Sequence, residues 1–343
     1  MKRKKNCAIY LPILAAVAFA SAAFAAPKTI YVDKNVASSG DGTSAVVDLN
    51  APDSTPLFGI SRQTLIAHRG HVALSTTVAQ PPENTLASID EAVAEGFGFE
   101  CDVLYTKDGR VFTMHDGCFK RVYDIDSEDY ASMTWDYVSH LVPIDCSGRR
   151  HPETRAALFE EVCGRARDGR WCFVELKTGG EIVPLIKKVL RSQDVANPGN
   201  LAFISFSQDA IRALKRELPE YKAMLLMYSR HAWPSQTDRP DHSPYTAEQC
   251  LEALAACGAD GLDFHFNGTI PEHGPDFVKR IKSAGYEFHV WVVDDFALVR
   301  QAFANGAQTV TTNHAKPILE RARFAAACRV SCDFKGKETN HNR

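Results

Sequence analysis

Short apolar runs alternate with amphipathic stretches along most of the chain. The run TLIAH precedes NTLASIDEAVAEG, WCFVELK precedes EIVPLIKKVLRSQ, and LAFISFS precedes QDAIRALKREL. A repeated order of strand and then helix predicts parallel strands joined by crossover helices. Eight strands are expected, and they end at His68, Asp102, Lys177, Ser205, Tyr228, Phe264, Val293 and Thr312. The pattern therefore predicts an α/β chain folded as a (β/α)8 TIM barrel.

The second strand of this barrel is predicted to continue into a β-hairpin. Residues 99–116 read FECDVLYTKDGRVFTMHD, and the DG pair at 108–109 is a two-residue turn signal. With these two residues at the centre of the turn, Asp102 faces His115. The hairpin would leave the barrel rim and bring His115 back to it. A register shifted by one residue would turn His115 away.

Acidic side chains are concentrated on two of the predicted strands. Glu100 and Asp102 are two residues apart and share a face of their strand, as do Glu175 and Lys177. Three carboxylates and a lysine are thus expected to converge at the rim. Carboxylate oxygens suit a hard cation such as Ca²⁺ or Mg²⁺. A network of salt bridges with Lys177 and Arg69 is the alternative.

Basic groups at the same rim suggest phosphoryl chemistry. His68 and Arg69 lie at the end of the first predicted strand, in the sequence IAHRG. His68 and His115 are a candidate pair of general acid and general base. Arg69 can bind phosphate oxygens through two parallel hydrogen bonds.

The N-terminal segment of the chain suggests export. A basic head is followed by the apolar run 9–20 and the cleavage-like sequence AFA at 23–25. This order predicts a signal peptide over residues 1–25 and a periplasmic or secreted protein. Residues 26–62 are rich in Ser, Asp, Gly and Pro and are predicted to be a leader segment. The barrel is expected over 63–325 and a polar tail over 326–343.

Composition limits the partners. The chain has 343 residues, 45% of them hydrophobic, and a net charge of −3, which gives no indication of nucleic-acid binding. No later run reaches transmembrane length, so no stable membrane anchor is expected. Residues 117–152 have no clear period and predict a small insertion, followed by a helix over 153–168. Cys101, between two acids, should point to the opposite face and into packing.

Eight short motifs carry a resemblance to a known family. They are HRG at 68–70, PENT at 82–85, ECD at 100–102, TKDG at 106–109, HD at 115–116, ELK at 175–177, SFS at 205–207 and VWVVD at 290–294. Their order resembles that of the glycerophosphodiester phosphodiesterase family. The resemblance covers about residues 63–322, and it implies a TIM barrel that hydrolyses glycerophosphodiesters to glycerol 3-phosphate and an alcohol.

The resemblance also implies roles for single residues. It implies metal ligation by Glu100, Asp102 and Glu175, acid–base roles for His68 and His115, and substrate binding by Arg69, Lys177, Asn84, Ser207 and Trp291. Glu83 would orient the loop that carries Arg69. Three places depart from the family. Asp294 replaces the usual Asn after the WTV motif, the final strand reads TTNHAKP where an Asp is frequent, and Arg121-Val122-Tyr123 stands where Arg-Thr-Thr is usual after HD.

Three other functions remain open. A lipid-directed phosphodiesterase, such as a lysophospholipase D or a phosphoinositide phospholipase relative, is kept open by Trp135, Tyr137 and Trp233 in loops. An exported, non-catalytic phosphodiester-binding protein is the second alternative, and a sugar-phosphate isomerase is the third. The expected partner is a small-molecule phosphodiester, and the sequence leaves the oligomeric state undetermined.

Overall fold

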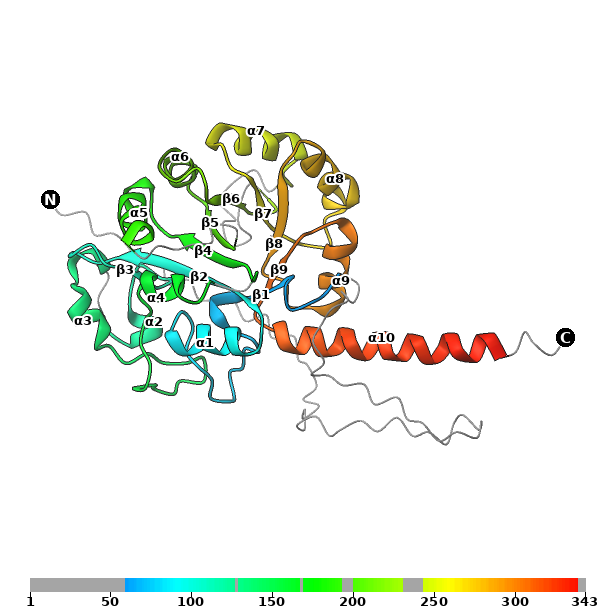
Figure 1. Cartoon of the computed structure of the whole chain (residues 1–343), viewed down its shortest axis with the longest axis horizontal. Helices are drawn as coiled ribbons and strands as arrows, with labels where there is room; N and C mark the ends of the chain where they lie inside the picture. Colours follow the sequence, from blue (N-terminus) through cyan, green and yellow to red (C-terminus); the bar gives the residue numbers. More distant parts are fainter. Residues whose placement is uncertain (1–58, 127–128, 167–168, 193–199, 231–242, 339–343) are drawn as a thin grey trace. The chain divides into compact units, whose positions relative to one another are not determined.

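A closed barrel forms the centre of the computed structural model (Figure 1). The structure describes residues 59–126, 129–166, 169–192, 200–230 and 243–338, with side chains up to residue 326, all in the unit Asp53–Arg343. The barrel strands are β1 (Leu65–Ala67), β2 (Gly98–Tyr105), β4 (Cys172–Leu176), β5 (Leu201–Ser205), β6 (Lys222–Met227), β7 (Gly261–His265), β8 (Glu287–Trp291) and β9 (Val310–Thr312). They are parallel, and β1 pairs with both β2 and β9, which closes the ring. The predicted (β/α)8 fold is confirmed.

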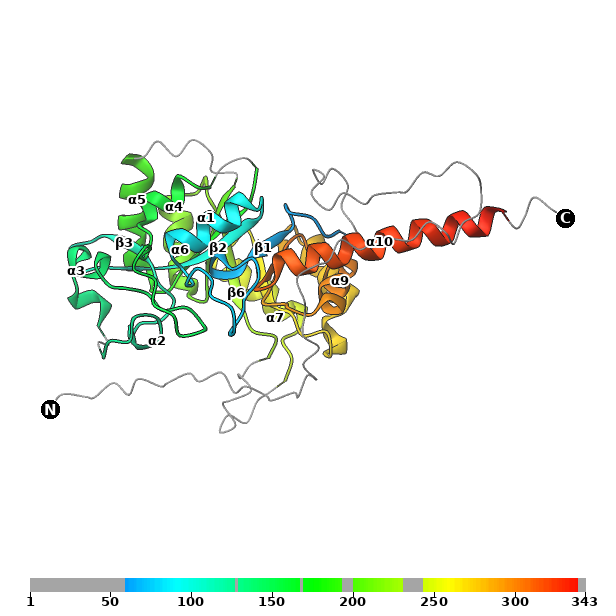
Figure 2. The same cartoon turned by 90° about the horizontal axis from the view of Figure 1, so that it is seen from below.

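Helices cover the outside of the strands. They are α1 (Leu86–Ala94), α4 (Phe159–Cys163), α5 (Val183–Ser192), α6 (Gln208–Glu217), α7 (Ala247–Cys257), α8 (Pro275–Ser283), α9 (Phe296–Asn305) and α10 (Ala315–Glu338). Figures 1 and 2 show α4 and α5 on one side of β1 and β2, and α9 on the other. Several helices begin at side-chain caps, among them Thr85, Ser207 and Thr246.

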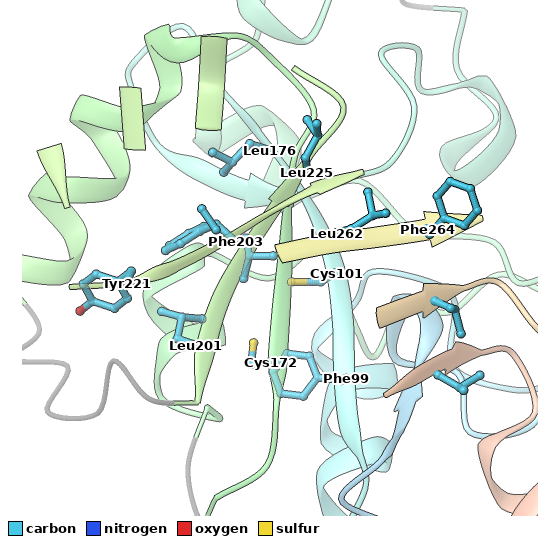
Figure 3. Close-up of a cluster of buried hydrophobic side chains, with 14 of the residues drawn as sticks. Phe99, Cys101, Cys172, Leu176, Leu201, Phe203, Tyr221, Leu225, Leu262 and Phe264 are labelled. Carbon is cyan, nitrogen blue, oxygen red and sulfur yellow. The ribbon is translucent and has the colours of Figure 1, made fainter. Parts of the chain in front are cut away.

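The main hydrophobic core lies between the strands and these helices. Alternate strand residues such as Phe99, Cys101 and Cys172 point into it and are at most 2% exposed. Figure 3 shows these three side chains close together on β2 and β4. The prediction that Cys101 points into packing is confirmed. Ile60 is buried in the same core, so the folded part begins before the predicted start at residue 63.

The inside of the barrel has an apolar floor beneath a charged layer. Ile66, Phe173, Ile204 and Met224 form part of a buried cluster inside the ring. Strand alternation then places the next inward residues above them, nearer the carboxyl ends of the strands. On β4 the residue above Phe173 is Glu175. The barrel is therefore filled with side chains, and its polar groups lie at the rim.

The insertion after the hairpin has a small core of its own. It contains α2 (Lys120–Tyr123), the 3-10 helix η3 (Tyr130–Ser132) and α3 (Trp135–Ser139), packed around a separate hydrophobic cluster. The helix predicted over 153–168 is wrong at both ends, because α4 spans only Phe159–Cys163. The preceding residues are extended and form bridges, Thr85 with Ala156 and Phe112 with Leu158.

The hairpin register also differs from the prediction by one residue. Strand β3 (Val111–Thr113) pairs with β2 so that Tyr105 faces Val111. The loop has three residues, 107–109, because Thr106 N donates to Arg110 O at 2.9 Å. Gly109 at φ +74° occupies its left-handed position. Three loop residues instead of two shift every pair by one position.

The chain leaves the strand before this shift reaches the histidine. Met114 N donates to Asp102 O at 2.9 Å, so Asp102 faces Met114 and not His115. Strand β3 has already ended at Thr113, and strand alternation does not determine the direction of His115. The inference that a one-residue shift turns His115 away from the rim therefore does not apply here.

The predicted ends of the domain are only partly visible. The proposed signal peptide and most of the leader lie outside the described residues. Helix α10 crosses the expected boundary at residue 325 without a break. Among the described residues, no helix has the length and hydropathy to span a membrane.

Candidate active site

The three predicted metal ligands converge at the carboxyl ends of two adjacent strands. One carboxylate oxygen from each of Glu100, Asp102 and Glu175 lies within 4.8 Å of the others. The parallel register pairs Asp102 of β2 directly with Glu175 of β4, and alternation brings Glu100 to the same face. Their exposed fractions are 3%, 1% and 9%. The donor set is purely oxygen, which fits a hard divalent cation.

The electrostatics of this group favour a bound cation. Burial, Asp102 and Glu175 raise the pKa of Glu100 well above its ordinary value. Burial and Asp102 raise the pKa of Glu175 to about 7, against the opposite effect of Lys177. Burial also acts on Asp102, but His115, Lys177 and Arg69 hold its pKa well below the usual range. Nearby basic groups therefore stabilise one of the carboxylates as an anion and leave the other two with a tendency to keep a proton.

Lys177 and Arg69 lie against the same carboxylates. Lys177 Nζ is 2.8 Å from Glu175 Oε1 and 3.4 Å from Asp102 Oδ1. Arg69 Nε is 3.6 Å from Asp102 Oδ2. The salt-bridge network considered as the alternative is thus present, yet the raised pKa values of the two glutamates show that it does not neutralise the group. Both basic side chains are 17% exposed and can reach a phosphate in the mouth of the barrel.

A strained loop after β1 carries Arg69. Its φ is +54°, and its backbone N donates to Glu100 Oε2 at 2.9 Å. Gly70 follows at φ +82°, where a Cβ atom would lie 2.9 Å from Ile89 N. Glu83 accepts from Arg69 Nη1 at 2.9 Å. Glu83 therefore orients Arg69, as predicted.

Asn84 supports one of the three clustered carboxylates instead of lining the pocket. Its Nδ2 donates to Asp102 Oδ2 at 2.8 Å, and its Oδ1 accepts from Asp102 N at 3.0 Å. The side chain is 2% exposed. Both ends of the amide are occupied, so the structure places Asn84 behind Asp102 and not against a substrate.

His68 is held in one tautomer by two residues that sequence reasoning gave no role. His68 Nδ1 lies 2.8 Å from Asn313 Oδ1, and Asn313 Nδ2 donates to Asp294 Oδ2 at 2.9 Å. A carboxylate only accepts, so it fixes the amide with Nδ2 toward Asp294 and Oδ1 toward the histidine. Nδ1 of His68 must then carry the proton, and Nε2 has the free lone pair. That nitrogen is 3.9 Å from Glu100 Oε2.

His115 has a different partner. Its Nδ1 lies 2.6 Å from Asp116 Oδ1, and Arg121 Nε donates to the other oxygen of this carboxylate at 2.6 Å. Although burial opposes it, His115 and Arg121 lower the pKa of Asp116 to about 2. An ionised carboxylate at Nδ1 accepts a hydrogen bond from the ring and fixes its orientation.

The remaining predicted residues lie on the β5–β8 side of the rim. A pocket of about 400 Å³ is lined by Glu175, Lys177, Phe206 and Ser207, among others. Ser207 also caps α6 by accepting from Ala210 N. Trp291 Nε1 donates to Asp263 O, so this residue offers only its ring, which lies 5.5 Å from that of Phe206.

Sequence reasoning gave Asn313, Asp116 and Arg121 no role in the site. Signals existed, because Asp294, Arg121 and the segment TTNHAKP stand where the chain departs from the family pattern, and Asp116 belongs to the HD motif. That Asp294 and Asn313 touch one another was not visible, because they follow different strands.

Fold and site together define a TIM-barrel enzyme built for phosphoryl transfer. The model of the glycerophosphoryl diester phosphodiesterase family matches residues 68–316. The chain belongs to this family and is a phosphoric diester hydrolase. A comparison with curated protein sequences found no match.

Solved structures share the fold at low sequence identity. A glycerophosphodiester phosphodiesterase from Parabacteroides distasonis is 23% identical with a TM-score of 0.57, over 77% of this chain and 98% of that one. A phosphodiesterase from Oleispira antarctica, in complex with the product sn-glycerol-3-phosphate, is 23% identical with a TM-score of 0.58, over 76% and 96%. The enzyme from Thermotoga maritima is 20% identical with a TM-score of 0.56, over 75% and 97%.

Proposed function

We propose that this protein is an exported, cation-dependent enzyme that hydrolyses glycerophosphodiesters to glycerol 3-phosphate and an alcohol. The observation that carries the proposal is the convergence of three carboxylates with the basic side chains of Arg69 and Lys177, beside two histidines whose Nδ1 atoms face different partners. Glu100, Asp102 and Glu175 would hold Ca²⁺ or Mg²⁺. When bound, the cation supplies charge stabilisation for the phosphoryl oxygens.

The two histidines take opposite roles in this proposal. His68 Nε2, with its free lone pair, removes the proton from the attacking hydroxyl, which belongs to water or to the glycerol 2-position. His115 gives a proton to the oxygen of the alcohol as the bond from phosphorus to that oxygen breaks. The partners of the two rings differ, because His115 Nδ1 faces the carboxylate of Asp116 and His68 Nδ1 faces the neutral amide of Asn313. Arg69 and Lys177 stabilise the charge on the non-bridging oxygens.

The first test is activity on glycerophosphocholine with and without cation. We expect glycerol 3-phosphate release that a chelator abolishes and that Ca²⁺ or Mg²⁺ restores. Glu175→Gln should lose this response, while Glu220→Gln, an exposed carboxylate on the loop before β6, should keep it. Absence of turnover with any phosphodiester would favour the binding-protein alternative.

The second test separates acid from base. His68→Ala and His115→Ala should each lower kcat by about 10²–10⁴ with an ordinary alcohol leaving group. A p-nitrophenyl leaving group needs no protonation, so it should largely restore the His115→Ala variant and leave the His68→Ala variant slow. The opposite pattern would exchange the two roles.

A lipid substrate is the second candidate. Phe206 lines the pocket, is 39% exposed and stacks on Tyr228, so apolar surface adjoins the phosphate site. The loop aromatics that suggested a lipid substrate do not form this surface: Trp135 packs in the insertion core, Tyr137 is exposed, and Trp233 lies outside the described residues. Assays on a lysophospholipid in parallel with glycerophosphocholine decide between the two substrates.

A further inference from the structure

A second group of potential metal ligands lies beside the loop that carries Arg69. A ring nitrogen of His71, a carboxylate oxygen of Glu83 and the thiol of Cys146 lie within 4.8 Å of one another. None of the three belongs to the carboxylate group of Glu100, Asp102 and Glu175. The first two residues follow β1 in the chain, and Cys146 belongs to the insertion after the hairpin.

His71 has the features of an unused ligand. The residue is 5% exposed, and its Nε2 is buried with no hydrogen-bond partner among the described residues. Buried polar nitrogens in folded proteins are almost always satisfied, so this one needs an explanation. Burial lowers the pKa of His71 to about 4, so the ring is neutral and has a lone pair to offer.

Cys146 provides access and a fixed position. Its side chain is exposed, so an ion can reach the group from solvent. The turn that carries it is held by Asp145, whose Oδ1 accepts from the backbone of Ser147 and Arg149 at 2.8 and 3.0 Å. His151 Nε2 lies 3.0 Å from the other oxygen of the same carboxylate. The thiol is thus presented by an ordered turn.

The surroundings of Glu83 select the kind of ion. Its Oε1 accepts from Arg69 Nη1 and Arg121 Nη2, and its Oε2 accepts from Arg121 Nη1. Two guanidinium groups oppose a cation such as Ca²⁺ or Mg²⁺, which is held mainly by charge. A thiolate and an imidazole instead suit Zn²⁺ and similar transition metals. One lone pair of Oε2 remains for such an ion.

We propose that His71, Glu83 and Cys146 form a second metal site that takes Zn²⁺ and that inhibits the enzyme when occupied. Binding replaces the thiol proton by the metal and draws electron density from Glu83. The carboxylate then holds Arg69 less firmly, and Arg69 faces Asp102 in the mouth of the barrel. The binding claim stands alone, whereas the inhibition claim rests on the role proposed for Arg69.

Cobalt absorption tests the binding claim without any assay of turnover. With the carboxylate site saturated by Mg²⁺, one equivalent of Co²⁺ should give a thiolate-to-cobalt charge-transfer band. Cys146→Ser should abolish the band, and His71→Gln should weaken Co²⁺ binding at least about tenfold. Cys118→Ser is the matched control, a partly buried thiol of the same insertion, and should keep the band. A band that survives in Cys146→Ser, or its absence in the unaltered protein, would overturn the site.

Zn²⁺ titration of the Mg²⁺-loaded enzyme tests the inhibition claim. We expect loss of phosphodiester turnover that Cys118→Ser retains and that Cys146→Ser shows only at Zn²⁺ concentrations at least about tenfold higher. Each variant is compared with its own rate without zinc. A cobalt band without inhibition would support the metal site and refute its coupling to Arg69. Lack of turnover in all samples would instead refute the proposed function, while the cobalt result would still decide the site.

Discussion

The contact between Asp294 and Asn313 makes a prediction about the proton on His68. Asp294 accepts from Thr312 Oγ1, Asn313 N and Asn313 Nδ2 at 2.8–2.9 Å. Both carboxylate oxygens of Asp294 thus act as acceptors. In Asp294→Asn, an NH₂ group, which can only donate, replaces one of them. The simplest relief is for Asn313 to turn its amide over and to present Nδ2 to His68. His68 Nδ1 must then accept, and the proton moves to Nε2, where the proposed base needs a lone pair.

The size of the effect follows from the hydrogen bond that is lost. A hydrogen bond to a charged group contributes about 1.5–3 kcal/mol. If this energy no longer favours the reactive tautomer, kcat/KM should fall about 10- to 150-fold, at about 1.4 kcal/mol per factor of ten. Asn313→Asp alone should also be slow, because it places two carboxylates at the 2.9 Å contact.

The double variant Asp294→Asn with Asn313→Asp should recover activity. It restores one donor and one acceptor with their positions exchanged, and the new carboxylate at 313 again accepts from His68 Nδ1. A carboxylate there favours the imidazolium and raises the pKa of His68, which burial and Arg69 lower to about 3. Since a base must be unprotonated, the acidic limb of kcat/KM should move to higher pH in the double variant.

Kinetics and nitrogen NMR together check this reasoning. The ring nitrogens of His68 should show the proton on Nδ1 in the unaltered protein and in the double variant, and on Nε2 in Asp294→Asn. Asp295→Asn is the matched control, because within the described parts of the chain this neighbouring carboxylate only caps α9. Single effects that merely add in the double variant, or an unchanged tautomer in Asp294→Asn, would refute the proposed control of the His68 proton.

Three further predictions concern the cation, a glycine and the lysine. Because the pKa of Glu175 is raised to about 7 and that of Glu100 is raised as well, the apparent Ca²⁺ affinity should fall about tenfold or more per pH unit below 7. These raised pKa values also mean that the cation-free protein loses stability as pH rises through 7. Added cation should therefore raise Tm more at pH 8 than at pH 6. Equal Tm shifts at the two pH values would contradict the assignment of Glu175 and Glu100 as cation ligands. Gly70→Ala should lower the free energy of unfolding about 1–3 kcal/mol more than Gly148→Ala. Both glycines have φ above +80°, but only at Gly70 does backbone lie within 3 Å of the added Cβ. Equal losses in a denaturant titration would exclude this close approach. Lys177→Met should lower kcat/KM about 10²-fold. It should also tighten cation binding, because Lys177 pairs with Asp102 and Glu175, two of the proposed ligands. A weaker affinity for Ca²⁺ in calorimetry would argue against these contacts.

The sequence alone determined the barrel and the face that carries its three clustered carboxylates. Eight apolar runs were enough to count the strands, and the spacing of Glu100, Asp102 and Glu175 placed them on inward faces. These inferences hold because strand alternation is a local property of the backbone, and the ends of parallel strands meet at one rim.

Only the tertiary structure decided the register of the hairpin and the state of the histidines. One additional loop residue shifted the pairing, and the end of β3 released His115 from strand alternation. The contact of His68 with Asn313 joins residues 245 positions apart, and it exists because β1 pairs with β9 when the barrel closes. Local patterns carry no information on such a closure, so the proton on His68 is a property of the fold.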